Sequence, residues 1–269
     1  MSMICYPKSS CVTLFVFAHQ DDEMGVFGEI EASIARGERV ACAYLTDGTA
    51  GRYDPSIRNC ESAAALASFG VAPEGVRFIG ADLAIPDGRL VEHLDQAFAA
   101  VQAFAEELGA VTRIVMHAWE GGHQDHDAVH LIGIALAREL RLVEASQQFP
   151  LYRRLPGSPL PFVMFQPIAA NGTVAWMPIS ASSRLRYLKL LAGYPSQRKT
   201  MLGLGPLVVW HYLVHGAQQL QPVSLSRISE MPHAGRLLYE TRTQVSWKAF
   251  CRHSKPFRRA HGLLLSDPI

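Results

Sequence analysis

A run of apolar residues, Val12–Phe17, is followed closely by one imidazole and three carboxylates, those of His19, Asp21, Asp22 and Glu23. This pattern predicts a buried strand that delivers polar side chains to the edge of a sheet. Neighbouring carboxylates repel one another, and they ionise readily only when a cation or a strong basic partner lies among them. The sequence therefore indicates a site for a divalent metal ion.

A second polar cluster lies later in the chain and contains His123, Asp125 and His126. It follows another apolar run, Arg113–Met116, so a second strand is expected to end near His117. In a parallel α/β sheet, ligand sites form beyond the carboxyl ends of the strands, where the strand order reverses. We expect the loops after the first and fourth strands to meet there and to bring imidazole and carboxylate groups together.

With both clusters considered, the chain resembles the PIG-L/LmbE family of zinc-dependent sugar N-deacetylases. The family motifs Ala-His-Pro-Asp-Asp-Glu and His-Pro-Asp-His correspond to Ala18-His19-Gln20-Asp21-Asp22-Glu23 and His123-Gln124-Asp125-His126. Both prolines are glutamine here, which changes loop rigidity because proline fixes φ, but no metal-binding or catalytic side chain is lost. The resemblance extends from Val12 to about Leu140 and includes Thr46-Asp47-Gly48, Arg58 with Glu61, and Pro86-Asp87-Gly88.

Three residues are candidate metal ligands. Zinc in a hydrolytic site takes three protein ligands and keeps one position for water. His19, Asp22 and His126 fit this count, and the resemblance implies that they bind one Zn²⁺ per chain, with another divalent metal as an option. In the alternative, His19 and Asp22 only cap the helix expected from Met24. Capping explains Asp22 but leaves the second cluster unexplained, so we expect a metal centre.

The resemblance also implies catalytic roles. Asp21 is the candidate general base, which would take a proton from water during attack on an amide carbonyl; an outer metal ligand is its alternative role. His123 would donate a hydrogen bond or proton to the oxyanion, with Asp125 holding the imidazole protonated and aimed; a satisfied surface histidine is the alternative. Some family members have tyrosine where Gly121 stands, so Trp119 or a residue from the second half would complete the oxyanion pocket.

Substrate contact is expected from Arg58 and Asp87. Arg58 resembles a family arginine that reaches substrate hydroxyls or a phosphate, and an ion pair with Glu61 one turn later is the alternative. Asp87 lies in a turn by its local chemistry, at a position that can meet sugar hydroxyls in the family. Glu23 is expected to brace its loop, and His130 to be a packed or solvent-facing histidine instead of a fourth ligand.

The activity that the resemblance implies is removal of the N-acetyl group from an N-acetylglucosamine-type sugar or glycoconjugate, which releases acetate and a free amine. No residue pattern identifies the aglycone. A metal-dependent phosphoesterase stays open, although it would usually need a second metal within ~4 Å. An amidase that acts on a sugar-thiol conjugate and a non-catalytic sugar- or lipid-binding protein stay open as well, although binding alone would not require Asp21.

Size and composition fit one large α/β domain. A chain of 269 residues buries a substantial core without disulfides. With 49% hydrophobic residues, 18% charged residues and a net charge of +1, disorder is disfavoured and the chain as a whole is not a nucleic-acid binder. The five cysteines are odd in number and form no CxxC pair, which indicates neither a disulfide framework nor a thiolate zinc site. A cytoplasmic protein is therefore expected.

Strand and helix patterns alternate through the first half, which predicts a Rossmann-like three-layer α/β sandwich with a mostly parallel central sheet. The expected strands are 12–18, 40–45, 76–79 and 113–116, and the expected helices are 24–36, 55–69, 91–108 and 126–140. Residues 1–269 are expected to form a single deacetylase domain, with the catalytic core in 1–141 and an α+β elaboration in 142–269 that shapes the substrate pocket.

The second half yields fewer signals. A strand is expected over 173–179, with antiparallel pairing as one option, and a helix over 183–191 with Arg184, Arg186 and Lys189 exposed. The uncharged segment 200–226 is interrupted by glycine, proline and histidine, so it cannot supply the ~20 mainly apolar residues of a membrane span.

We expect a buried helix in 200–226, with a surface that rests on a lipid or a lipid-linked substrate as the alternative. The basic tail over 236–259 is expected to be a solvated face, and a pyrophosphate or an anionic lipid is its alternative partner.

Overall fold

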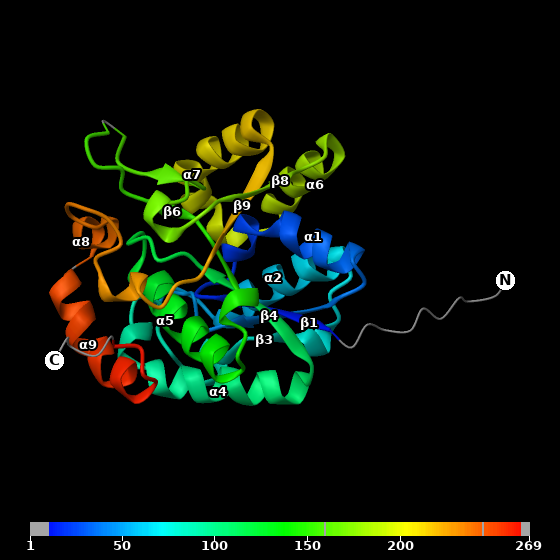
Figure 1. Cartoon of the computed structure of the whole chain (residues 1–269). Coiled ribbons are helices and arrows are strands. Elements are labelled where there is room, and N and C mark those ends of the chain that lie inside the picture. The colour runs from blue at the N-terminus through cyan, green and yellow to red at the C-terminus, as the bar shows by residue number, and fades with distance from the viewer. Residues whose placement is uncertain (1–10, 159, 244, 265–269) are drawn as a thin grey trace.

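A seven-stranded sheet runs through the computed structural model, which describes residues 11–158, 160–243 and 245–264 (Figure 1). Its order is β3-β2-β1-β4-β5-β9-β8. The strands of this sheet are β1 (Val12–Phe17), β2 (Arg39–Tyr44), β3 (Val76–Arg77), β4 (Val111–His117), β5 (Gln147–Phe149), β8 (Ala175–Pro178) and β9 (Ala217–Pro222). A separate hairpin pairs β6 (Tyr152–Arg153) with β7 (Val163–Met164).

The first five strands of the order pair in parallel, and β9 pairs antiparallel with both β5 and β8. The order reverses between β1 and β4, so the loops that follow these two strands open on the same point of the sheet edge. The predicted α/β class with a mostly parallel sheet is confirmed, and so is the antiparallel strand near residue 175.

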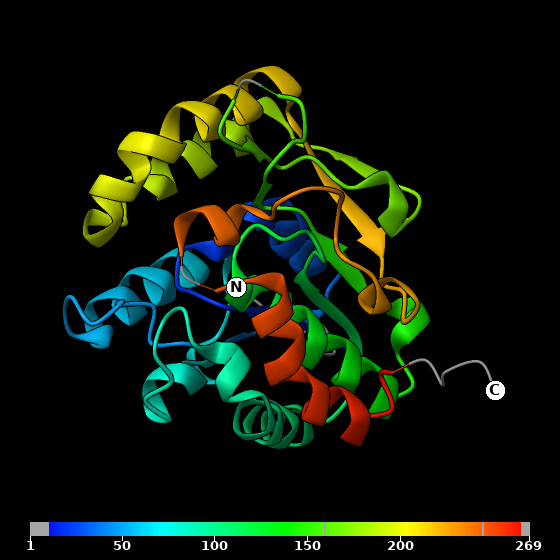
Figure 2. The same ribbon diagram turned by 90° about the vertical axis from the view of Figure 1, so that its left-hand side faces the viewer.

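Helices cover both faces of the sheet (Figures 1 and 2). Those of the first half are α1 (Phe27–Ala35), α2 (Pro55–Phe69), α3 (Ile79–Asp82), α4 (Leu94–Leu108) and α5 (Gln124–Glu139). Those of the second half are α6 (Ala181–Leu191), α7 (Arg198–Trp210), α8 (Leu238–Arg242) and α9 (Trp247–Ala260).

Successive side chains of β1 point to opposite faces of the sheet and so contribute to two separate hydrophobic clusters. Leu14 and Val16 pack into a cluster with α4, α5 and α9, whereas Phe15 and Phe17 pack into another cluster with α1, α2, α6 and α7. Figure 2 shows α9 (red) beside α4 and α5 on one side of the molecule and α7 (yellow) on the other. The chain is thus a three-layer sandwich in which the C-terminal helices complete both outer layers.

Local sequence explains the helix α2 particularly well. Asp54 accepts a hydrogen bond from the Ser56 N–H at 2.8 Å, Pro55 occupies the first turn, and Gly70 ends the helix with φ of 96°. These are the start and stop signals that the sequence offers. The helix expected from Met24 begins differently, because the 3-10 turn Asp22–Gly25 precedes α1.

The second half departs from two expectations. Arg184 and Arg186 are half-buried, because Arg184 donates to backbone carbonyls and Arg186 forms an ion pair with Glu31 at 2.8 Å. The buried-helix prediction for 200–226 is wrong, since α7 leaves Leu202 81% exposed and Trp210 59% exposed. No helix among the described residues has the length and apolar character needed to cross a membrane.

Candidate metal centre and substrate pocket

The loop after β1 folds so that His19 and Asp22 face one another. Asp21 adopts the left-handed region with φ of 91°, which is unusual for a residue with a side chain. The Asp22 carboxylate reaches back and accepts the His19 backbone N–H at 2.7 Å. This reversal sets the His19 Nδ1 3.4 Å from Asp22 Oδ2.

His126 approaches the same carboxylate from the first turn of α5. Its Nε2 lies 3.4 Å from Asp22 Oδ1, and neither of its ring nitrogens has a hydrogen-bond partner among the described residues. Two atoms that each lie ~2.1 Å from a tetrahedral ion are roughly 3.4 Å apart, which matches these spacings. Burial lowers the pKa of His126 to about 4, which leaves the neutral imidazole that metals bind.

Three overlapping groups of donors could hold a metal ion among the described residues. They are His19, His123 and His126; Asp22, His117 and His126; and His19, Asp87, His123 and Asp125. The predicted ligands His19, Asp22 and His126 span the first two groups. Buried nitrogen and oxygen donors of this kind, with unpartnered lone pairs on His126, fit zinc.

Arg58 is the direct partner of the candidate base. It is only 4% exposed, and its guanidinium lies 2.7 Å from Asp21 Oδ1 while also donating to the backbone carbonyls of Gln20 and Gly48. Burial raises the pKa of Asp21 to about 7, and Arg58 opposes that rise. The alternative pairing with Glu61 is wrong, because Glu61 accepts hydrogen bonds from Ser196 instead.

Glu23 braces the loop, as the sequence predicts. It is fully buried, and its Oε2 accepts the Asp21 backbone N–H at 2.9 Å while Oε1 accepts the Tyr194 hydroxyl at 2.6 Å. Tyr194 comes from the second half of the chain. The candidate base is therefore held from both its backbone and its side chain.

Asp125 is closer to His19 than to His123. Its Oδ2 lies 3.2 Å from His19 Nε2 and 3.9 Å from His123 Nδ1, and its two oxygens accept the N–H groups of Gly88 and Leu90. Asp125 therefore orients a candidate ligand and the neighbouring turn, which is the usual role of a carboxylate behind a metal-bound histidine.

His123 caps α5 and is neutral in this arrangement. Its Nδ1 accepts the Asp125 backbone N–H at 3.2 Å, and burial together with the nearby His19 lowers its pKa to about 4. The expectation that Asp125 keeps this imidazole protonated differs from the structure. With Nδ1 used as an acceptor, the ring hydrogen lies on Nε2, which is 4.0 Å from Asp87 Oδ1.

These side chains line a pocket of about 150 Å³ whose wall also includes residues of the second half. The lining residues are His19, Asp21, Asp22, Met24, Arg58, Asp87, His123, Leu151, Tyr152, Gln197, Thr200 and Leu204. Asp87 Oδ1 lies 3.1 Å from His19 Nε2, so Asp87 belongs to the same cluster as the candidate ligands. The pocket brings every predicted catalytic and substrate residue to one place except Asp125, which lies just behind it.

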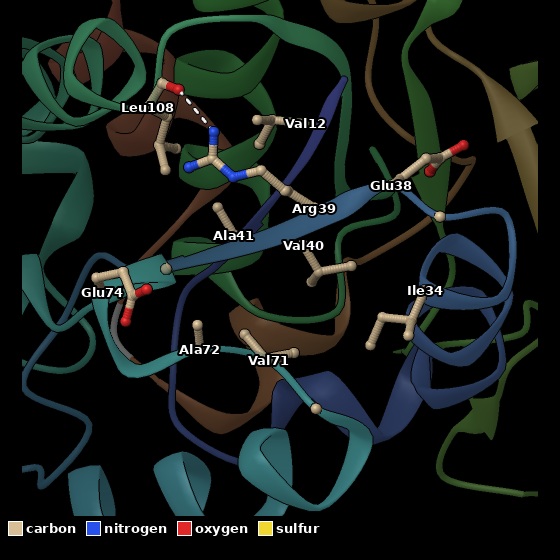
Figure 3. A pocket seen from close by; sticks show the side chains of 13 residues that line it. Val12, Ile34, Glu38, Arg39, Val40, Ala41, Val71, Ala72, Glu74 and Leu108 are labelled. Carbon is tan, nitrogen blue, oxygen red and sulfur yellow. Dashed lines mark hydrogen bonds between the residues drawn. The ribbon is translucent and has the colours of Figure 1, made fainter. Parts of the chain in front are cut away.

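A larger cavity of about 400 Å³ lies at the other end of the strands (Figure 3). Val12 and Arg39, the first residues of β1 and β2, line it, and Arg39 donates to the Leu108 carbonyl across it at 3.3 Å. It shares no residue with the metal cluster and contains no histidine. In α/β sheets ligands bind beyond the carboxyl ends of strands, so we assign the chemistry to the smaller pocket.

A comparison with protein-family models matches residues 14–137 to the family described as PIG-L, GlcNAc-PI de-N-acetylase. Residues 14–137 belong to the PIG-L family. The PIG-L segment contains all the candidate ligands and the candidate base, so the chain carries the catalytic segment of an N-deacetylase. Among curated proteins, none matches the chain significantly.

Several solved structures share the fold. A zinc-inhibited form of the teicoplanin deacetylase Orf2 superimposes with a TM-score of 0.58 at 16% identity, over 79% of this chain and 98% of that one. The conserved protein TT1542 from Thermus thermophilus gives 0.54 at 21% identity, over 78% and 92%. The N,N'-diacetylchitobiose deacetylase from Pyrococcus horikoshii gives 0.55 at 14% identity, over 79% and 82%. At these identities the likeness establishes the fold.

The two glutamines that stand in place of the PIG-L prolines each form a hydrogen bond between a loop and a helix. Gln20 donates to the side chain of Asn59 at 2.6 Å, and Gln124 donates to the carbonyl of Gly88 at 3.1 Å. The turn that carries Asp87 is therefore tied to the start of α5. These hydrogen bonds supply the restraint that proline would supply through φ.

Gly121, at the position of the PIG-L tyrosine, has no room for a side chain. Its φ is 69°, and an added Cβ would lie 2.6 Å from the side chain of Leu237. Trp119 cannot replace the tyrosine, because it is fully buried and donates to the Glu230 carbonyl. Tyr152 of β6 lines the pocket instead, with its ring centroid 5.2 Å from that of His126.

Sequence reasoning missed two residues, His117 and Tyr152. The sequence indicates only that a strand ends near His117, and Tyr152 lies in a segment whose prolines obscure any strand or helix pattern. His130 is packed as predicted, since its Nδ1 lies 2.8 Å from the His117 carbonyl oxygen.

Proposed function

We propose that this PIG-L chain is a zinc-dependent hydrolase that removes the N-acetyl group from an N-acetylglucosamine-type sugar or glycoconjugate. The observation that supports this most strongly is the Asp22 carboxylate between His19 and His126, with Asp21 beside it in a shared pocket. The products would be acetate and a free amine.

In this proposal, His19, Asp22 and His126 hold one zinc ion per chain, and another divalent ion is an option. When bound, zinc polarises the scissile carbonyl and makes water a better nucleophile. Asp21 takes the proton of the attacking water, and its pKa of about 7 suits that task near neutral pH. The same proton can then pass to the leaving amine.

The developing oxyanion needs donors from the protein. His123 supplies its Nε2–H, because its Nδ1 is occupied as an acceptor. Tyr152 supplies a hydroxyl that burial keeps protonated, since its pKa is raised. Tyr152 thus takes the place of the PIG-L tyrosine that Gly121 excludes.

Substrate recognition is proposed for Asp87 and Arg58. Asp87 lines the pocket with its side chain 20% exposed, and a carboxylate at that position can accept sugar hydroxyls. Arg58 also lines the pocket, and we keep it as a contact for hydroxyls or a phosphate in addition to its bond with Asp21.

A lipid-linked substrate is included in the proposal because α7 connects the pocket to an apolar surface. Leu204 lines the pocket, while Leu202, Val209 and Trp210 of the same helix are exposed. Such a surface is suited to peripheral contact with acyl chains. We place the activity in the cytoplasm, as the cysteine content indicates.

The test is an acetate-release assay on zinc-loaded protein with free, nucleotide-linked, lipid-linked and thiol-linked N-acetylglucosamine compounds. Asp21→Asn should abolish release with metal content unchanged, whereas His126→Ala should lose the metal. Release from none of the compounds by fully loaded wild type would contradict the proposal. Two metals per chain and release of phosphate from a phosphoester would favour the phosphoesterase alternative.

A further inference from the structure

His117 has no part in the mechanism above, yet it lies against the metal cluster. It ends β4 and is fully buried, and its Nε2 lies 3.1 Å from Asp22 Oδ2. Its Nδ1 has no hydrogen-bond partner among the described residues. A buried histidine whose side chain has polar contacts only through the nitrogen that faces a candidate metal ligand is a candidate functional residue.

We propose that His117 is a positioning residue that donates from Nε2–H to Asp22 Oδ2 and so fixes the Asp22 carboxylate between His19 and His126. This inference rests on the metal centre of the proposed function. It adds a residue outside the motifs that identify the family.

The contacts of the Asp22 carboxylate support this role. Oδ2 accepts the His19 backbone N–H at 2.7 Å and faces His117 Nε2 at 3.1 Å. Oδ1 lies 3.4 Å from His126 Nε2. Oδ2 also lies 3.4 Å from His19 Nδ1, so each of the two candidate histidine ligands faces one oxygen of Asp22. Two donors on Oδ2 therefore fix the carboxylate in the orientation that places it between His19 and His126.

The alternative, that His117 is itself a ligand together with His126, conflicts with the ring geometry. The two imidazoles are stacked, with centroids 3.9 Å apart and planes within 6°. A histidine lone pair lies in the plane of its ring, and two parallel planes separated by van der Waals contact share no point where one ion could bind both. His19 and His126 are tilted by 54° and can converge.

The contacts of His117 indicate which of its ring nitrogens carries the hydrogen. With hydrogen on Nδ1, the Nε2 lone pair would face a carboxylate oxygen at 3.1 Å, which is repulsive. With hydrogen on Nε2 the same contact is a hydrogen bond. The Ala18 N–H donates toward the same Nε2 at 3.3 Å, which favours the opposite tautomer, but the shorter contact with the charged carboxylate outweighs this bond between neutral groups.

Two neighbouring residues also fix the position of the His117 ring. His130 Nδ1 donates to the His117 carbonyl at 2.8 Å, and the Phe149 ring lies with its centroid 4.6 Å from that of His117. Groups that orient a metal ligand typically contribute 10- to 100-fold in metal affinity. We expect an effect of that size here.

The experiment measures zinc affinity by competition with a chromophoric chelator, and the absorption spectrum of the Co²⁺-loaded protein, for wild type, His117→Leu and His117→Gln. Leucine fills the space without a donor, whereas glutamine places an amide donor near the position of Nε2. His211→Leu is the control, because His211 is also buried but packs against Phe165, far from the cluster in sequence.

We expect His117→Leu to bind zinc roughly 10- to 100-fold more weakly, with His117→Gln and the control within a few-fold of wild type. The Co²⁺ spectrum of every loaded variant should keep the wild-type band positions and intensities, because the set of ligands is unchanged. An unchanged affinity for leucine, or a spectrum that reports a lost ligand, would overturn the proposal.

If the leucine variant does not fold, His117→Asn replaces it, since asparagine places its amide near Nδ1, where it cannot reach Asp22. Equal affinities for the asparagine and glutamine variants would then refute the role. A wild-type protein that binds no metal would overturn the metal centre and this inference together. A wild type that binds zinc no better than His117→Leu would overturn this inference alone.

Discussion

Replacing Arg58 with methionine tests how the candidate base is held. Arg58 pairs with Asp21 at 2.7 Å and donates to the carbonyls of Gln20 and Gly48, all within a site where Arg58 is 4% exposed. Methionine retains most of the apolar stem and removes all three bonds. Asp21, which is 8% exposed, is left without a cationic partner.

The magnitude follows from these contacts. Breaking a buried ion pair by removing one partner costs about 3–5 kcal/mol, because the remaining charge is uncompensated. In urea, with a slope of about 3 kcal/mol/M, the unfolding midpoint of the metal-free protein should fall by ~1–1.7 M. The double variant with Asp21→Asn should be less destabilised than the sum of the single changes by ~0.5–3 kcal/mol, since the two residues are in contact.

The matched control is Arg186→Met, which removes the ion pair between Arg186 and Glu31. In this pair the arginine side chain is more than one-third exposed and the glutamate side chain about one-third exposed. A pair of that kind contributes at most about 1 kcal/mol. If Arg58→Met costs no more than this control and its effect simply adds to that of Asp21→Asn, the assigned bond is not the main role of Arg58. A loss confined to substrate affinity would instead favour direct substrate contact.

Three further outcomes are expected. Tyr152→Phe should lower kcat roughly 100- to 1000-fold with zinc affinity unchanged, and an unchanged kcat would exclude its hydroxyl from the oxyanion pocket. Burial raises the pKa of Glu120 to about 8, whereas this carboxyl group releases its proton near pH 4.5 in the unfolded chain. The folded state therefore binds more protons between these two pH values. The free energy of unfolding should fall as pH rises through this range, by up to ~1.4 kcal/mol per pH unit. Glu120→Gln, which can still accept the Leu151 and Tyr152 N–H groups, should therefore gain in Tm over wild type as pH rises from 5 to 8 in the metal-free protein, and a constant difference would contradict this assignment. Removal of metal by a chelator should abolish acetate release and lower Tm, with both restored by zinc, because an ion that binds only the folded state stabilises it.

The order of strands and longer helices through α5 could be predicted because most strands are short apolar runs and each longer helix has a cap or a glycine stop. The short helix α3 is the exception, since it begins at Ile79, where a strand is expected, and has neither signal. The convergence of the two motif loops could also be predicted, since a parallel sheet brings the carboxyl ends of its strands to one edge. What the sequence did not reveal were contacts between distant segments. The only partner within the chain that the sequence offers for Arg58 is the alternative Glu61, one turn later, yet the observed partner, Asp21, lies 37 positions earlier.

The second half was less predictable for a different reason. The apolar character of 200–226 indicated a buried helix, but hydrophobicity alone does not say which side chains find partners, and α7 leaves a row of them exposed. Tyr152 could not be singled out because nothing local distinguishes it, and its place in the pocket depends on the hairpin of β6 and β7. His117 reads as the end of a strand, and only the fold sets it against Asp22.

The hydrogen bond that the Gln124 side-chain amide donates to the Gly88 carbonyl couples the start of α5 to the neighbouring turn. Proline at the first position of α5 would act on its own residue alone, whereas the glutamine makes the start of that helix depend on the turn beside it. A change in the conformation of the 86–88 turn would then shift His126, which lies two residues after Gln124. A substitution in this turn would therefore alter the spacing among the candidate metal ligands.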